Sequence, residues 1–158
     1  MYASLDLRVA QHPSETLEHL LLRVIGYAVN YEEGLAFGRG ISTADEPAAW
    51  VKRPDGTIAL WLDVGTPSAE RLHKASKASL RVVVMTRTPE LTLREARSRP
   101  VHAPERVTIL SVETALLAAL SRLVERHNEM TVLLTGGRLY VTLAGQTIEG
   151  GLTSHALS

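Results

Sequence analysis

Residues 55–77, DGTIALWLDVGTPSAERLHKASK, constrain the fold most, because they carry the signals of a turn, a buried strand, a second turn and a basic helix in direct succession. In the predicted strand 58–64, side chains alternate between two faces, so Asp63 lies on the face opposite Leu62. Ser68 can cap the helix that follows. The basic residues of this helix recur at every third position and are Arg71, Lys74 and Lys77. The stretch therefore predicts an acid at a strand end beside a basic helix.

The composition predicts one soluble domain over residues 1–158. The chain is 45% hydrophobic and has a mean hydropathy of +0.03, which suffices to bury a full core. Its 17 Lys and Arg balance 17 Asp and Glu, so binding to nucleic acid would need a local basic patch. The absence of cysteine excludes disulfides, thiolate nucleophiles and Cys-ligated zinc. No leader pattern and no run of about 18 apolar residues is found, so we expect a cytoplasmic protein without membrane contact.

Residues 12–34 predict an amphipathic helix. Its expected start has His12 as the cap, Pro13 at the first helical position and Glu15 at the third. Gly34 would provide the left-handed stop. The apolar stripe that we expect to face the core consists of Leu17, Leu20, Leu21, Val24, Ile25 and Ala28.

Two acids of this helix are candidates for a functional site. At about 100° per residue, Glu18 lies at the border of the apolar stripe and Glu15 lies nearly opposite its centre. An acid in the first turn also complements the helix dipole, which gives Glu15 a purely structural interpretation. His19 follows Glu15 by four residues, so the two could share a metal ion, but we interpret them as a solvated pair on the helix surface. Gly26, inside the helix, predicts the close approach of another element.

Two further acids, Asp45 and Glu46, precede Pro47 and the second of three consecutive predicted strands. Adjacent acids before a proline commonly serve as turn residues. If the second and third strands pair, however, these acids lie at the height of Asp63, and three converging carboxylates repel unless a cation neutralises them. Both interpretations, a turn and a cation site, stay open on the sequence.

The rest of the chain predicts a mixed sheet with helices. The segment 87–104 is polar and rich in arginine, and its Arg94 and Arg97 belong either to a solvated face or to the border of a phosphate-binding groove. Gly136 and Gly137 favour a hairpin. The predicted strands are 4–10, 35–38, 48–53, 58–64, 80–85, 107–112, 130–134, 139–143 and a last edge strand at 144–148, with a frayed tail from Gly150, and the later helices are 68–77, 90–99 and 113–126.

The sequence contains no P-loop, GxGxxG, HExxH or GxSxG motif. It does resemble the bacterial YaeQ family in the runs HPSET at 12–16, GLAFGRG at 34–40, DEPAAW at 45–50, IALWLDVGTPSAERLHKA at 58–75 and MTVLLTGGRLYVTLAG at 130–145. The resemblance implies an α/β fold with a mixed sheet and a restriction-endonuclease-like core, in which a helix, three strands, a helix and a strand follow one another. A C-terminal helix and a β-hairpin would complete it.

The resemblance also implies a metal-centred PD-(D/E)XK site drawn from the first helix and from the second and third strands. Its helix acid would be Glu15 or Glu18, its first motif acid Asp45 or Glu46, and its second Asp63. The ligands of a Mg²⁺ or Mn²⁺ ion would then be Asp63, Asp45, Glu46 and Glu18.

The chain departs from this pattern at two positions. Gly65 stands where the motif lysine is expected, which makes Lys74 on the next helix the candidate for a displaced lysine. Ala59 stands where an acid is expected.

Two functions therefore remain. The first is a metal-dependent phosphodiesterase acting on nucleic acid. The second is a catalytically inactive module that binds nucleic acid or a protein partner. Nucleic acid would follow the basic residues Arg71, Lys74, Lys77, Arg94 and Arg97.

Overall fold

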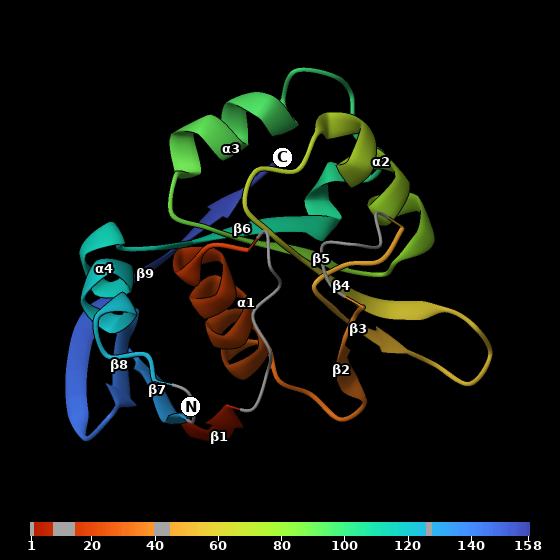
Figure 1. Cartoon of the computed structure of the whole chain (residues 1–158). Helices are drawn as coiled ribbons and strands as arrows, with labels where there is room; N and C mark the ends of the chain where they lie inside the picture. Colours follow the sequence, from red (N-terminus) through yellow and green to blue (C-terminus); the bar gives the residue numbers. More distant parts are fainter. Residues whose placement is uncertain (1, 8–14, 40–44, 126–127) are drawn as a thin grey trace.

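In this computed structural model, residues 2–7, 15–39, 45–125 and 128–158 are described, and they form a mixed sheet flanked by helices (Figure 1). The helices are α1 (Leu17–Val29), α2 (Ala69–Ala78), α3 (Pro89–Ala96) and α4 (Thr114–Ser121), with a 3₁₀ turn at Pro104–Arg106. The strands are β1 (Tyr2–Leu7), β2 (Leu35–Phe37), β3 (Ala49–Lys52), β4 (Ile58–Val64), β5 (Val82–Thr86), β6 (Val107–Val112), β7 (Asn128–Thr135), β8 (Arg138–Leu143) and β9 (Gln146–Ala156). The predicted α/β class and the predicted order from α1 to β5 are confirmed.

The strands within the described residues lie in the order β1-β7-β8-β9-β6-β5-β4-β3-β2. Strands β4, β5 and β6 run parallel to one another, and the remaining neighbours are antiparallel. Strand β9 joins the two halves of the sheet, because residues 146–151 pair with β8 and residues 152–156 pair with β6. The prediction of a short edge strand followed by a frayed tail is therefore wrong.

Helices cover both faces of the central strands (Figure 1). Leu60 and Leu62 pack with α1, whereas Trp61 packs with α2 and with the apolar side of α3. From Leu60 onwards this is the alternation that the sequence predicts for β4, with both faces buried. Ile58 and Ala59 lie on the faces opposite to those predicted, next to a register shift in the pairing with β3. Asp63 shares the face of Trp61 and is therefore directed towards α2. The face of β4 on which position 63 lies thus decides which helix can neutralise this acid.

Helix α1 begins later than the sequence suggested. Its cap is Thr16, whose hydroxyl accepts a hydrogen bond from the backbone N–H of His19 at 3.1 Å. Glu15 therefore precedes the helix instead of occupying its first turn, while His12 and Pro13 lie outside the described residues. The helix ends at Val29 with Asn30 as its C-cap, and not at Gly34.

The buried face of α1 is wider than the predicted stripe. Leu21, Val24, Ile25 and Ala28 are buried as expected, but Leu22 and Arg23 are buried too, and Leu20 is only half-buried. The close approach predicted at Gly26 is confirmed, since a Cβ there would lie 2.7 Å from Cγ of Met85. The burial of Arg23 requires a partner for its charge, and this partner belongs to the candidate site.

Several later elements differ in extent from the predictions. The helix expected over 113–126 ends at Ser121. The glycines at 136 and 137 turn β7 into β8 with positive φ values of 58° and 76°, as predicted for the hairpin. Among the described residues, no helix is both long enough and apolar enough to cross a membrane.

Candidate functional site

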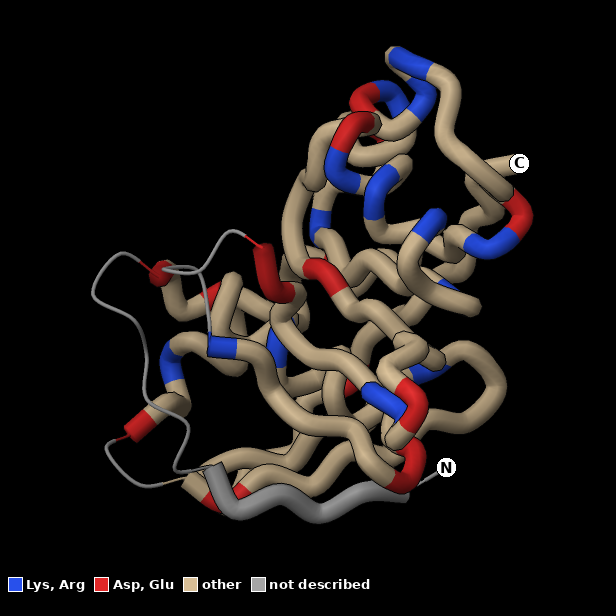
Figure 2. Tube along the Cα trace, turned by 90° about the vertical axis from the view of Figure 1, so that its right-hand side faces the viewer, with Lys and Arg blue, Asp and Glu red and all other residues tan. Residues whose placement is uncertain are grey.

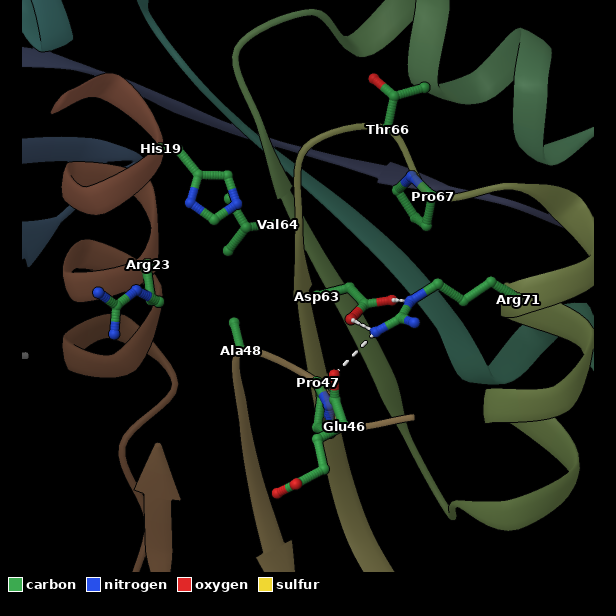
Figure 3. A pocket seen from close by; sticks show the side chains of 10 residues that line it. All are labelled: His19, Arg23, Glu46, Pro47, Ala48, Asp63, Val64, Thr66, Pro67 and Arg71. Carbon is green, nitrogen blue, oxygen red and sulfur yellow. Dashed lines mark hydrogen bonds and ion pairs between the residues drawn. The ribbon is translucent and has the colours of Figure 1, made fainter. Parts of the chain in front are cut away.

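A pocket of about 240 Å³ lies at the end of β4, between α1 and α2 (Figure 3). Strand β4 with the loop after it and the loop before β3 line the pocket between the two helices. The helices supply its basic side chains, and β4 and the loop before β3 supply its two acids. It is lined by His19, Arg23, Glu46, Pro47, Ala48, Asp63, Val64, Thr66, Pro67 and Arg71.

Asp63 and Arg71 form a bidentate ion pair on one side of this pocket. Arg71 donates from Nε to Oδ2 of Asp63 at 2.8 Å and from Nη2 to Oδ1 at 3.0 Å, and Nη2 also donates to the carbonyl oxygen of Glu46 at 3.0 Å. The side chain of Asp63 is 5% exposed and that of Arg71 is 32% exposed. Hydrogen bonding to Asp63 raises the pKa of the Arg71 guanidinium, burial opposes this shift, and the charges of Asp63 and Asp45 add to it. Arg71 thus holds the β4 acid and the loop before β3 together.

Glu15, His19 and Arg23 form a second charged cluster on the α1 side. The Glu15 side chain is fully buried and lies 2.5 Å through Oε2 from Nδ1 of His19. Arg23 donates from Nε and Nη2 to the two oxygens of Glu15, each at 3.1 Å. The interpretation of Glu15 and His19 as a solvated surface pair is therefore wrong, because the Glu15 side chain is buried against α1.

The structure brings together only part of the predicted site. Asp63 and Glu46 line the same pocket, and Glu15 lies behind it through its contacts with His19 and Arg23. Asp45 instead lines a neighbouring pocket of about 440 Å³, together with Lys74.

Three predicted residues lie apart from the pocket or have partners elsewhere. Glu18 is half-exposed on α1 and lines neither pocket. Lys74 is exposed and pairs with Glu70 at 3.3 Å. Glu46 forms an ion pair with Arg39. Of the three carboxylates that were predicted to converge on one cation, Asp63 is paired with Arg71 and Glu46 with Arg39, while Asp45 lines the neighbouring pocket.

The donor set does not fit a divalent metal ion. Both oxygens of Asp63 accept hydrogen bonds from Arg71, and both oxygens of Glu15 accept from Arg23. A hard cation needs several oxygen ligands of its own. Within the described part of the chain, no three His, Asp or Glu side chains lie together as such a set. In this arrangement the arginines already supply the positive charge that the resemblance would assign to a metal.

The name basic layer is used here for residues 69–99, in which α2 and α3 lie on one face of the sheet and β5, between them in the sequence, is a central strand. The basic layer contains eight Lys and Arg and three Glu, a net charge of +5 in a chain of zero net charge. In Figure 2, the blue segments gather in the upper half of the molecule, near the C-terminus. The exposed basic side chains of the basic layer are Lys74, Lys77, Arg81, Arg87, Arg94, Arg97 and Arg99.

Sequence reasoning did not assign His19 or Arg23 to the site. The signal was present, because Glu15, His19 and Arg23 are spaced four residues apart, the separation at which side chains meet along a helix. An arginine within the apolar run 20–25 was a further sign of a buried ion pair.

Comparison with known proteins gives consistent matches over nearly the whole chain. The family model described as "YaeQ protein" matches residues 1–151. The "Uncharacterized protein YaeQ" of Salmonella typhi is 28% identical over 151 residues, which cover 94% of this chain and 83% of that protein. The protein of the same description from Escherichia coli (strain K12) is 27% identical over 152 residues, with the same coverage.

Two crystal structures resemble the fold. The YaeQ protein from Xanthomonas axonopodis pv. citri has a TM-score of 0.77 and 25% identity, covering 94% of this chain and 85% of that chain. The YaeQ protein from Pseudomonas syringae has a TM-score of 0.78 and 32% identity, covering 92% and 82%. These similarities extend across both halves of the sheet.

Proposed function

The chain belongs to the YaeQ family, and we propose that it is a nucleic-acid-binding protein that works without a resident metal ion. The observation that carries this proposal is the segregation of charge, because the basic layer has a net charge of +5 while the whole chain is neutral. Arg71 and Arg81 of the layer pair with Asp63 and Glu32 outside it, which leaves an excess of +3. A local excess of this kind attracts phosphates and releases their counterions, which favours binding to a polyanion. The remaining surface carries the balancing negative charge and orients the molecule on its ligand.

The order of the elements supports a restriction-endonuclease-like core as part of this proposal. Helix α1, the antiparallel strands β2, β3 and β4, helix α2 and the parallel strand β5 follow one another in the order expected for that core. The candidate pocket lies at the end of β4, beside the basic layer. Nucleic acid lying along α2 would therefore pass the mouth of the pocket.

A metal-dependent phosphodiesterase has weaker support from the same geometry. Asp63 lies at the predicted strand end, but Arg71 takes both of its oxygens. Lys74 is paired with Glu70 on the exposed side of α2 and lines the neighbouring pocket with Asp45. Mg²⁺ or Mn²⁺ could bind only after the ion pair between Asp63 and Arg71 had opened. We therefore favour binding without metal.

Binding can be measured by fluorescence anisotropy with short labelled single- and double-stranded DNA and RNA in EDTA. We expect binding that weakens steeply with salt, and a shallower salt dependence in the double variant Lys74→Ala/Lys77→Ala, by roughly one unit of slope for each phosphate that the variant no longer neutralises. The matched control is Lys52→Ala/Arg53→Ala, which removes the same charge from two exposed residues at the end of β3 and just after it.

Three outcomes decide between the proposals. Equal loss of affinity in the two double variants would show that only net charge matters and that the basic layer is not the binding surface. No binding to any of the nucleic acids would refute the proposal and favour a protein partner. Calorimetric binding of Mn²⁺ to the wild type, abolished by Asp63→Asn, would favour the metal-dependent phosphodiesterase.

A further inference from the structure

One ring nitrogen of His19 contacts Glu15, and the other lies at the pocket. Nδ1 contacts the buried carboxylate of Glu15 at 2.5 Å, while Nε2 has no hydrogen-bond partner among the described residues. The side chain is 27% exposed and extends from α1 towards Val64 across the pocket (Figure 3). An imidazole with one nitrogen fixed by a buried acid presents the other in a defined direction.

Arg23 determines the role of that second nitrogen. Because the Arg23 guanidinium donates to both oxygens of Glu15, the acid is held as a carboxylate and can only accept from the imidazole. In the neutral imidazole, Nδ1 therefore carries the hydrogen and Nε2 carries the lone pair.

A permanent cation lies opposite His19 in the same pocket. Figure 3 shows His19 and Arg71 extending towards each other from α1 and α2. The ion pair between Arg71 and Asp63 fixes the Arg71 guanidinium in position. A phosphate group between the two side chains would have the lone pair of His19 Nε2 on one side and, on the other, the Arg71 guanidinium, which also binds Asp63. Such an arrangement suits phosphoryl transfer without a metal ion.

We propose that His19 is the general base of a metal-independent RNA-cleaving site, with Glu15 as its positioning residue. The proposal rests on the proposed function, because the basic layer must bring the strand to the pocket. His19 Nε2 takes the proton of a ribose 2′-hydroxyl, whose oxygen forms a bond to the adjacent phosphorus while the bond from phosphorus to the 5′-oxygen breaks. The imidazolium returns the proton through solvent water to that 5′-oxygen. The products are a 2′,3′-cyclic phosphate and a 5′-hydroxyl, and no water is consumed.

The choice of RNA follows from the chemistry of the pocket. DNA has no internal nucleophile, so its cleavage needs an activated water, which nucleases commonly obtain from a metal ion. The donor set of this pocket does not fit such an ion. The 2′-hydroxyl of RNA is already held next to the phosphorus and needs only a base.

The test uses the full chain in EDTA and a labelled DNA strand that contains a single ribonucleotide. We expect cleavage after the ribonucleotide with a cyclic phosphate end, identified by mass spectrometry, and none of the all-DNA or 2′-O-methyl strand. His19→Ala should lower the cleavage rate by about 10²- to 10⁴-fold at unchanged affinity, and added imidazole should restore part of it. His102→Ala, which removes an exposed histidine outside the pocket, should cleave like the wild type.

Glu15 is tested separately, through its effect on the imidazole. Glu15→Gln should lower kcat at unchanged KM and remove the downfield proton resonance of a carboxylate-bound Nδ1–H. A variant that loses this resonance and keeps full activity would show that Glu15 does not position the base.

The outcomes separate this proposal from the one before it. Binding of RNA without cleavage by the wild type overturns the catalytic proposal and leaves nucleic-acid binding intact. Cleavage that persists in His19→Ala, purified in the same way, assigns the activity to another base or to a contaminating nuclease and also overturns it. Cleavage that requires Mg²⁺ would indicate the metal-dependent mechanism instead. Absence of both binding and cleavage refutes both proposals.

Discussion

Replacing Arg71 with methionine would test how much the fold depends on the ion pair at the end of β4. The substitution keeps an unbranched side chain but removes both donors from Asp63, whose side chain is only 5% exposed. An uncompensated charge at such a site typically costs about 3–5 kcal/mol, and the partial exposure of Arg71 admits some water, so we expect about 3 kcal/mol. The carbonyl oxygen of Glu46 would also be left without the hydrogen bond that Arg71 donates to it.

Substitution of the acid instead of the arginine should destabilise the protein less. In Asp63→Asn, the Arg71 side chain, already 32% exposed, can turn towards water, and we expect a loss of about 1–2 kcal/mol, near the value of one hydrogen bond to a charged group. Lys74→Met is the control on the same helix. Its ion pair with Glu70 has side-chain exposures of 75% and 67%, so its removal should change stability by less than about 1 kcal/mol.

The assay is urea unfolding at neutral pH, followed by circular dichroism, with m-values compared across the three variants. The expected order of destabilisation is Arg71→Met, then Asp63→Asn, then Lys74→Met. A cost for Arg71→Met no larger than that for Asp63→Asn would refute the reasoning, because the asymmetry rests on the deeper burial of the acid. Equal costs in all three would mean that the pair contributes no more than a surface ion pair does.

Three shorter predictions concern other parts of the fold. Leu21→Ala should cost about 2–5 kcal/mol in urea unfolding, and Leu20→Ala clearly less, because Leu21 is 1% exposed and Leu20 is half-buried. Thr92→Val, which removes a buried hydroxyl shared by a cluster of threonines, should cost about 1–3 kcal/mol, and Thr92→Ser should restore most of that stability. Hydrogen bonds from Thr57, chiefly from its side chain, lower the pKa of Asp55. The stability that this acid adds is therefore present above its unfolded pKa and lost as the pH falls through the folded value, and NMR titration of Thr57→Ala should show the Asp55 pKa moving back up.

Local rules predicted the central strands and the second helix well. The alternation in β4 assigned Asp63 to the face opposite Leu62, and Ser68 accepts a hydrogen bond from the backbone N–H of Arg71 as a cap. Both depend on steric and hydrogen-bonding preferences within a few residues. The identity of the partner of Asp63 depends on how α2 lies across β4, which periodicity does not describe. Arg71 was therefore assigned to a basic surface alone.

The error at Glu15 has a different cause. Its angle around the helix was calculated as though the helix began at Pro13, but α1 begins at Leu17. A residue before the helix is not bound by the helical angle, and its side chain can reach back over the first turns. The sequence thus singled out Glu15 as a candidate but did not predict its burial.

The segment from Gly150 was predicted to be a frayed tail, although its two glycines are required by packing. A Cβ at Gly150 would lie 2.8 Å from Cβ of Leu116, and one at Gly151 would lie 2.9 Å from Oε1 of Glu113. Helix α4 therefore rests directly on the backbone of β9. Small residues permit this approach, and a sequence window cannot distinguish it from a flexible tail.

The position of β9 bears on how the chain emerges from the ribosome. During synthesis, β6 has no partner on its outer side until residues 152–156 appear, and β1 waits for residues 128–133 before it can pair. Such long separations along the chain slow folding. Until then, the nascent polypeptide exposes an unpaired strand edge, which is a site for intermolecular pairing. We therefore expect chaperones that act on nascent chains to engage this protein late in translation.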